Sequence, residues 1–159
     1  MDVDTPATRA LAGTALAFHV VRTVPPSSAE ESAALQSIEV GQLLRTILIR
    51  RGRNDYVFVL VPGGRSIAWP KLRAHLGLSR LSLPGQEEAK AATGYERGAI
   101  TPFGAATAWP VIADASIGEL GTVAIGGGGR GVNLHLDAAD LLEALAADVA
   151  DVTVPGDVR

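Results

Sequence analysis

Two runs of β-branched and apolar residues near the middle of the chain restrict its fold more than any other feature. Residues 46–50 read Thr-Ile-Leu-Ile-Arg and residues 56–61 read Tyr-Val-Phe-Val-Leu-Val, with the polar segment 51–55 between them. Such residues favour extended backbone, and runs without polar alternation are typical of strands covered on both faces. Because the link is short and polar, the pattern predicts an antiparallel hairpin at the centre of a sheet.

Helix and strand signals alternate on both sides of this hairpin. Thr5 and Pro6 suit an N-cap followed by proline in the first helical turn, and Asp137 suits an N-cap before a helix whose leucines at 141, 142 and 145 face the core. The expected helices are 6–16, one from Ser28, 70–77, 86–92 and one after Asp137, with a helical turn at 40–44. The other expected strands are 17–23, 120–125, 132–136 and 149–154, the last closing the sheet. This order predicts one α+β domain, residues 1–154, with a mixed, mostly antiparallel curved sheet or barrel surrounded by helices, and a C-terminal tail at 155–159.

Composition excludes several classes of protein. A chain of 159 residues with 47% hydrophobic content suits a single packed domain. It has no cysteine, which removes disulfides, thiolate metal sites and a cysteine nucleophile. No stretch reaches the roughly 18 apolar residues that a membrane span needs, and the acidic start lacks the basic region of a signal peptide. We therefore expect a cytoplasmic location and no membrane partner.

Charge is distributed unevenly along the chain, although the formal net charge is only -3. Between Arg45 and Arg80 there are eight Lys or Arg residues and one acid, Asp55, a local net charge of +7. Acids dominate from Asp137 onward. One basic face of the protein therefore suits an RNA end, while the alternative is that these arginines are solvated strand and turn residues.

Catalytic and metal-binding motifs of the common kinds are absent from the sequence. His19, His75 and His135 are widely spaced and fit no metal-ligand pattern, so no metal site is expected. The glycine-rich run 126–131 leads into an expected strand, whereas a dinucleotide-binding glycine loop opens into a helix. Two glycine loops, 98–104 and 126–131, remain as candidate sites. Their amides suit a phosphate or an oxyanion, and tight turns at strand ends are the other interpretation.

A resemblance to a known family covers nearly the whole chain. Residues 93–95, Thr-Gly-Tyr, followed by Gly98-x-Ile-x-Pro-x-Gly104, are similar to the signature of the YbaK-type aminoacyl-tRNA editing domain, also called the prolyl-tRNA synthetase associated domain. Segments 5–11, 28–35, 40–48, the glycine run to Asn133 and 140–142 follow in the order typical of that family. The resemblance implies a pocket for the 3′-terminal adenosine of tRNA and its esterified amino acid, without a cofactor.

The resemblance also implies roles for individual residues. Gly98 is implied as the loop glycine whose backbone meets the substrate. Arg45 stands at the position to which the family assigns the holding of the substrate, and Thr46 follows it at the start of the central strand. The implied pocket-lining residues are Ala99, Ile100, Pro102, Phe103, Gly128, Gly129, Asn133 and Thr23. The arginines assigned to tRNA are Arg50, Arg51, Arg73 and Arg130.

Two departures from the family pattern bear on activity. The family has lysine where this chain has Arg45, and a forked guanidinium does not replace a point-like ammonium. Members that clear cysteine carry aromatics near the position of Thr23, so the amino-acid preference stays open.

We expect a trans-acting deacylase for mischarged tRNA, with tRNA-Pro carrying Cys, Ala or another small amino acid as candidate substrates. The alternative is a non-catalytic homologue that binds tRNA or an adenosine ligand. An aminoacyl-tRNA synthetase is a candidate partner, and DNA is not expected.

Overall fold

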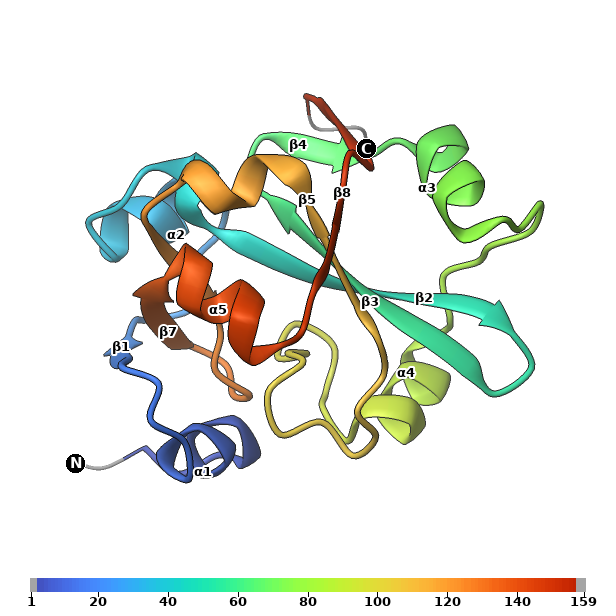
Figure 1. Ribbon diagram of the computed structural model, residues 1–159. Coiled ribbons are helices and arrows are strands. Elements are labelled where there is room, and N and C mark those ends of the chain that lie inside the picture. The colour runs from blue at the N-terminus through green and yellow to red at the C-terminus, as the bar shows by residue number, and fades with distance from the viewer. Residues whose placement is uncertain (1–2, 157–159) are drawn as a thin grey trace.

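The computed structural model describes residues 3–156, and the predicted hairpin forms its centre (Figure 1). Strand β2 (Leu44–Gly52) pairs antiparallel with β3 (Asp55–Pro62), with Thr46 opposite Leu60. On the other side of β3, β5 (Val111–Asp114) runs parallel to it, and β8 (Asp148–Ala150) runs parallel to β5. The sheet order β2-β3-β5-β8 therefore leaves β2 at one end.

A second sheet is antiparallel throughout and meets the first beside β2. It has the order β1-β7-β6, from β1 (His19–Arg22), β7 (Val132–Asp137) and β6 (Thr122–Gly126). A bridge between Leu43 and Ala124 joins the start of β2 to β6. A third pair, β4 (Arg65–Ile67) with β9 (Thr153–Pro155), is also antiparallel. The predicted α+β class with mostly antiparallel pairing is confirmed, while the strands of residues 3–156 do not close a barrel.

Short helices surround the sheets. They are α1 (Pro6–Ala12), α2 (Ala29–Leu35), α3 (Trp69–Leu76), α4 (Gln86–Thr93) and α5 (Ala138–Ala144), with the 3-10 helices η1 (Val40–Gln42) and η2 (Ala115–Glu119). The expected caps are present, since the side chains of Thr5 and Asp137 accept from Thr8 N and Asp140 N. Gly77 and Gly94 end α3 and α4 in the left-handed conformation. No helix among the described residues is long and apolar enough to cross a membrane.

Strands β4 and β5 were not expected, and three of the expected segments differ from the structure. Helix α1 ends at Ala12, where Gly13 caps it, rather than at residue 16. The expected final strand is two strands in different sheets, β8 and β9, so it closes no sheet on its own. The expected tail at 155–159 begins inside β9, because Pro155 pairs with Arg65 and the Gly156 amide donates to the Gly64 carbonyl at 2.7 Å. Residues 157–159 lie outside the described part of the chain.

The central hairpin buries side chains on both of its faces. One cluster contains Leu44, Leu48, Phe58 and Leu60, and these residues pack toward α1, the loop after α4 and the second sheet. The other cluster contains the alternate residues Ile49, Val57, Val59 and Val61 with Leu72 of α3. Since successive strand residues point to opposite faces, the apolar runs that predicted the hairpin are explained by its two covered faces.

Asp114, at the end of β5, is a buried carboxylate that joins three segments. Its side chain is 2% exposed and accepts from Ser116 N at 3.0 Å and Val152 N at 3.1 Å, with Arg65 Nε at 3.8 Å. Burial alone would raise the pKa of Asp114, but hydrogen bonds from Ser116, Val152 and Thr153 outweigh it and hold the pKa below 3.8. The ionised carboxylate therefore stabilises the junction of β5, η2 and β9.

We expect Asp114→Asn to lower the free energy of unfolding at pH 7 by about 1–3 kcal/mol, because an amide replaces a charged acceptor. A pKa lowered by folding means that the carboxylate stabilises the fold above its unfolded pKa and that this contribution is lost as pH falls through the folded pKa. The difference between wild type and variant should therefore shrink below about pH 4. Urea unfolding of both proteins at pH 7 and pH 3 measures this difference in the free energy of unfolding. A difference that is the same at both pH values would contradict the role given to the ionised carboxylate.

Candidate active site

A cavity of 610 Å³ lies between β2, the start of α4 and the loop that follows α4. In Figure 1, α4 and this loop lie on one side of β2, and β4 and α3 lie on the other. The cavity brings together four residues expected in the site, Arg45, Thr46, Gly98 and Ile100. The other lining residues are Leu44, Ile47, Leu48, Leu83, Pro84, Gly85, Gln86, Ala89, Arg97 and Gly126.

Gly98 lies in a tight turn whose geometry explains the glycine. The Ala99 amide donates to the Glu96 carbonyl at 3.0 Å, which closes a four-residue turn. Gly98 is third in this turn with φ 88°, as in a type II turn, where a positive φ is required. A Cβ at Gly98 would meet nothing within 4 Å, so the space beside its Cα is open.

The backbone amides beside Gly98 differ in availability. The Ala99 amide is already bonded to Glu96, and Ala99 is buried outside the cavity lining. The amides of Gly98 and Ile100 have no hydrogen-bond partner within residues 3–156. Two donors separated by one residue in the cavity wall are suited to an oxygen that carries negative charge.

The rest of the loop is held by the core and does not line the cavity. The Tyr95 hydroxyl donates to the Phe103 carbonyl at 2.5 Å, and both side chains are buried. Burial raises the pKa of Tyr95 to about 12, so the hydroxyl stays protonated as a donor at neutral pH. Pro102 lies between them in the chain and also lies outside the cavity lining. These residues fix the loop that presents Gly98 and Ile100.

Thr46, which lines the cavity from β2, carries an unpaired hydroxyl. Its Oγ1 is buried and is the only such side-chain nitrogen or oxygen without a hydrogen-bond partner in the part of the chain that the structure describes. An unsatisfied buried hydroxyl costs about 1–3 kcal/mol, so residues that keep one usually bond it to a ligand or a water. Thr46 therefore carries an unpartnered polar atom on the part of β2 that lines the cavity, between the buried side chains of Leu44 and Leu48.

The charge of the cavity lining is positive. Arg45 is exposed, and its guanidinium donates to the Arg65 carbonyl in β4. Arg97 is also exposed and has no ion pair among the described residues. The lining contains no Asp or Glu. Two cations at a cavity with amide donors and apolar walls suit a ligand with a phosphate and an apolar or aromatic body.

Besides Ala99, Pro102 and Phe103, four more residues that the resemblance placed in the pocket do not line the cavity. Gly128 and Gly129 pack against Thr5, and a Cβ at Gly128 would come within 2.9 Å of the Tyr95 ring. Asn133 Nδ2 donates to the Val21 carbonyl at 3.1 Å, and the Thr23 amide donates to Gly131 O at 2.9 Å. The second glycine loop therefore packs the β1–β7 end against α1, and none of these residues lines the cavity.

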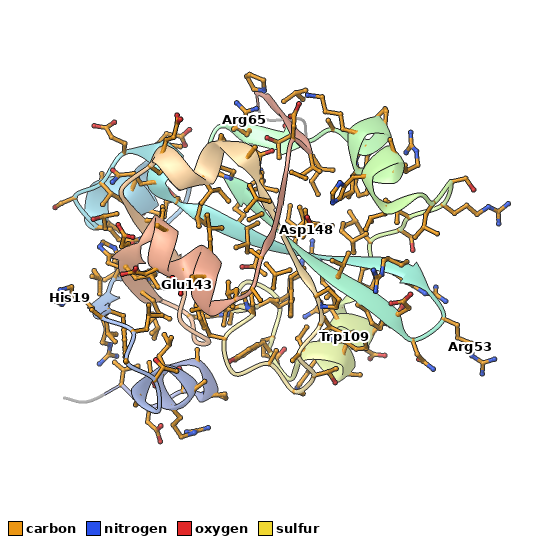
Figure 2. All side chains as sticks on the ribbon, viewed as in Figure 1. His19, Arg53, Arg65, Trp109, Glu143 and Asp148 are labelled. Atoms are coloured by element: carbon orange, nitrogen blue, oxygen red, sulfur yellow. The ribbon has the colours of Figure 1, made fainter. Side chains whose placement is uncertain are left out.

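Three of the four arginines expected to bind tRNA lie around one hollow. Arg50, Arg51 and Arg73 line a cavity of 600 Å³ together with Arg80 and serines 79 and 82. Arg50 lies 3.5 Å from Glu88 and Arg51 lies 2.8 Å from Asp55, so part of this charge is paired. Arg130 is exposed in the second glycine loop and does not line this hollow. Arg53, at the hairpin tip, points away from the molecule (Figure 2).

Sequence reasoning missed Arg97 and the segment 83–86 of the cavity wall. Arg97 precedes the motif glycine directly, and that position was the available signal. Segment 83–86 reaches the cavity because the chain after α3 pairs with β2, where Arg50 N donates to Ser82 O at 2.8 Å. A single long-range bridge of this kind leaves no pattern in the local sequence.

The histidines lie outside the cavity lining. His135 is half-buried with its Nε2 at 2.8 Å from Gln36 Oε1, so its ring is held by a hydrogen bond. Burial, and next the neighbouring His19, lower the pKa of His135, so its ring is neutral at pH 7. Within residues 3–156, no group of three or more His, Cys, Asp or Glu could hold a metal ion.

Comparison with curated proteins gives two kinds of relative. The chain is 24% identical over 126 residues to the Enterococcus faecalis protein named "Putative Cys-tRNA(Pro)/Cys-tRNA(Cys) deacylase EbsC", covering 79% of this chain and 77% of that one. It is 32% identical over 108 residues to a proline–tRNA ligase of Thermosipho melanesiensis. That match covers 68% of this chain but only 19% of the ligase, so the chain spans about a fifth of that relative.

Solved structures share the fold. A hypothetical protein matches with a TM-score of 0.85 at 21% identity, covering 94% of this chain and 99% of that one. A protein described as a "putative trans-editing enzyme for prolyl tRNA synthetase" matches with a TM-score of 0.78 at 26% identity, covering 86% of this chain and 87% of that one. The family model for the aminoacyl-tRNA editing domain matches residues 23–144. That range holds β2, the Gly98 loop and the cavity between them, and the chain belongs to the aminoacyl-tRNA editing domain family.

Proposed function

We propose that this protein is a trans-acting deacylase that hydrolyses the ester bond of mischarged aminoacyl-tRNA in the cytoplasm. The observation that carries the proposal is the cavity at β2, which Thr46, Gly98 and Ile100 line together: the buried Thr46 hydroxyl and the amides of Gly98 and Ile100 have no hydrogen-bond partner among the described residues. Arg45 and Arg97 add positive charge at the same cavity, which suits the 3′-terminal nucleotide of tRNA.

The chemistry requires no side-chain nucleophile. In the proposed reaction a water oxygen attacks the ester carbonyl carbon, and the carbonyl oxygen becomes an oxyanion that accepts from the amides of Gly98 and Ile100. The bond from that carbon to the ribose oxygen then breaks. The ribose oxygen takes up a proton from the water, which leaves free amino acid and uncharged tRNA. Because the ester is already activated, positioning and charge stabilisation suffice.

Thr46 has a positioning role in this proposal. Its hydroxyl holds either the attacking water or a ribose hydroxyl, since both are of a size and polarity that a buried threonine oxygen can bond. The apolar neighbours Leu44 and Leu48 fix the threonine on the central strand. Such a rigid support is what a positioning residue needs.

The preferred substrates are tRNAs that carry a small amino acid, with cysteinyl- and alanyl-tRNA-Pro first. The names of two relatives concern Cys-tRNA and prolyl-tRNA synthetase, and these support tRNA-Pro as the carrier. A synthetase partner is part of the same proposal.

Purified protein incubated with cysteinyl-, alanyl- and seryl-tRNA should release amino acid faster than the spontaneous rate for at least one of them. No release from any of them above that rate would overturn the proposal.

We expect Thr46→Val to separate activity from stability. Valine keeps the shape but removes the hydroxyl, so kcat/KM for the preferred substrate should fall about tenfold, the value of one lost hydrogen bond of about 1.4 kcal/mol. The same change removes an unsatisfied polar atom, so the melting temperature should stay the same or rise. Thr46→Ser, which keeps the hydroxyl, is the matched control and should retain activity. Equal activity of the valine and serine variants would show that the hydroxyl has no role.

A non-catalytic tRNA or adenosine-ligand binder is the second candidate. It is favoured by Arg45, whose guanidinium is held by the Arg65 carbonyl, where the family pattern has lysine. This candidate predicts tRNA binding that weakens with salt while the deacylation panel shows no turnover. The two proposals therefore give opposite outcomes in the same panel.

A further inference from the structure

A second cavity of 670 Å³ lies on the other side of β2 from the Gly98 loop. Its wall comes from β4 and the start of α3, which lie together above β2 in Figure 1. The side chains that matter are Trp69 and Pro70 of α3 and Ile67 of β4, with Val154 of β9. We call this cavity the Trp69 compartment.

The Trp69 compartment and the catalytic cavity share part of their walls. Arg45, Ile47 and Leu83 line both. Leu83 is 60% exposed, an unusual position for a large apolar side chain, and it lies where the chain crosses β2 after the Arg50–Ser82 bridge. The two cavities therefore adjoin each other, and Arg45 is the cation that belongs to both linings.

The chemistry of the Trp69 compartment suits a flat aromatic group beside an anion. Trp69 is half-buried, and Val154 is 37% exposed, so apolar surface is open to solvent there. Arg45 and Lys71 supply positive charge, and the lining contains no acid, although Lys71 is paired with Asp151 at 2.9 Å. Aromatic side chains with nearby cations are how proteins bind bases of single-stranded nucleic acid without reading their sequence.

We propose that the Trp69 compartment binds the nucleobase of the nucleotide that precedes the 3′-terminal adenosine, stacked on Trp69. This inference rests on the proposed function, since it needs the terminal adenosine in the catalytic cavity. The phosphate that joins the two nucleosides then passes beside Arg45, which lines both compartments. A forked guanidinium fixed by the Arg65 carbonyl suits a phosphate better than a flexible ammonium does, which gives Arg45 a role that lysine would not match.

A substrate series tests this subsite. The substrates are the preferred amino acid esterified to adenosine and to cytidylyl-adenosine, the dinucleotide of a tRNA 3′ end. The kcat/KM for the cytidylyl-adenosine ester divided by that for the adenosine ester measures what the added nucleotide contributes. We expect the ratio to exceed one in the wild type, and to fall at least about fivefold in Trp69→Ala, the lower end of what one stacked base contributes. Trp69→Phe keeps an aromatic face and should keep most of the ratio.

Matched measurements separate stacking from structure. Leu35→Ala, which removes an exposed apolar side chain of α2 outside both cavities, should not change the ratio. A Trp69→Ala ratio equal to that of the wild type would overturn the subsite, even if turnover of both substrates fell together. Such a parallel fall would indicate a structural role for Trp69 only.

Fluorescence gives a readout that needs no hydrolysis. The chain has two tryptophans, and Trp109 is packed against Tyr56 with its Nε1 bonded to the Ala92 carbonyl. Titration with cytidylyl-adenosine should therefore quench Trp69 in the wild type and leave the Trp69→Phe signal unchanged. Quenching without deacylation would leave the subsite standing and overturn the proposed catalysis. Deacylation without quenching of Trp69 would overturn the subsite and leave the proposed catalysis standing.

Discussion

Replacing Gly98 by proline should lower kcat/KM for deacylation by about 10²–10³-fold, the loss measured for one donor to a developing oxyanion. Proline has no amide hydrogen, so one of the two free donors at the cavity disappears. It also fixes φ near −65°, whereas Gly98 has φ 88°, so the turn from Glu96 to Ala99 has to rearrange. Both effects act at the loop, and initial rates with the preferred aminoacyl-tRNA measure them.

Gly98→Ala is the control that keeps the amide. An alanine Cβ would meet nothing within 4 Å, so its cost is confined to the positive φ, about 1 kcal/mol or slightly more. We expect alanine to lower the melting temperature slightly and to retain far more activity than proline. If the proline variant deacylates as fast as wild type, the oxyanion is not held by the Gly98 amide, and the proposed mechanism is wrong.

The parts of the fold that could be predicted are those with local signals. The hairpin follows from two apolar runs, and Gly77 and Gly94 end helices where a left-handed residue is required. Strand β5 has no comparable signal, because four residues after Pro110 become a strand only through parallel pairing with distant β3. The final strand was expected as one piece, and Asp151 and Val152 instead let the chain pass from the large sheet to the β4 pair.

The candidate site shows the same division between local and long-range information. Gly98, Ile100 and Thr46 match the family pattern, Arg45 stands at its lysine position, and the fold brings all four to one cavity. Gly128 is a glycine for another reason, because Tyr95 and Thr5 leave no room for a side chain. A glycine-rich run gives the same sequence signal whether its amides face a ligand or its Cα atoms face a packed neighbour. Only the three-dimensional contacts distinguish these cases.

The far end of the Gly98 loop is fixed by a close approach to α1, and disturbing it should destabilise the whole domain. Gly104 has φ 68°, and a Cβ there would lie 2.3 Å from the Pro6 carbonyl oxygen and 2.8 Å from the Ala7 amide nitrogen. These are backbone atoms, so no side-chain rotation relieves the overlap.

We expect Gly104→Ala to reduce the free energy of unfolding by about 3–5 kcal/mol, which adds the cost of a left-handed alanine to that of overpacking. Gly121→Ala is the matched control, because Gly121 has φ 72° but nothing within 4 Å of its Cβ, and it should cost only about 1–2 kcal/mol. Urea unfolding of both variants isolates the contact with α1 from the backbone strain. Equal losses would mean that α1 moves away at little cost. A larger loss for Gly104 means that α1, although distant from the cavity in sequence, holds the loop whose amides are proposed to face the substrate.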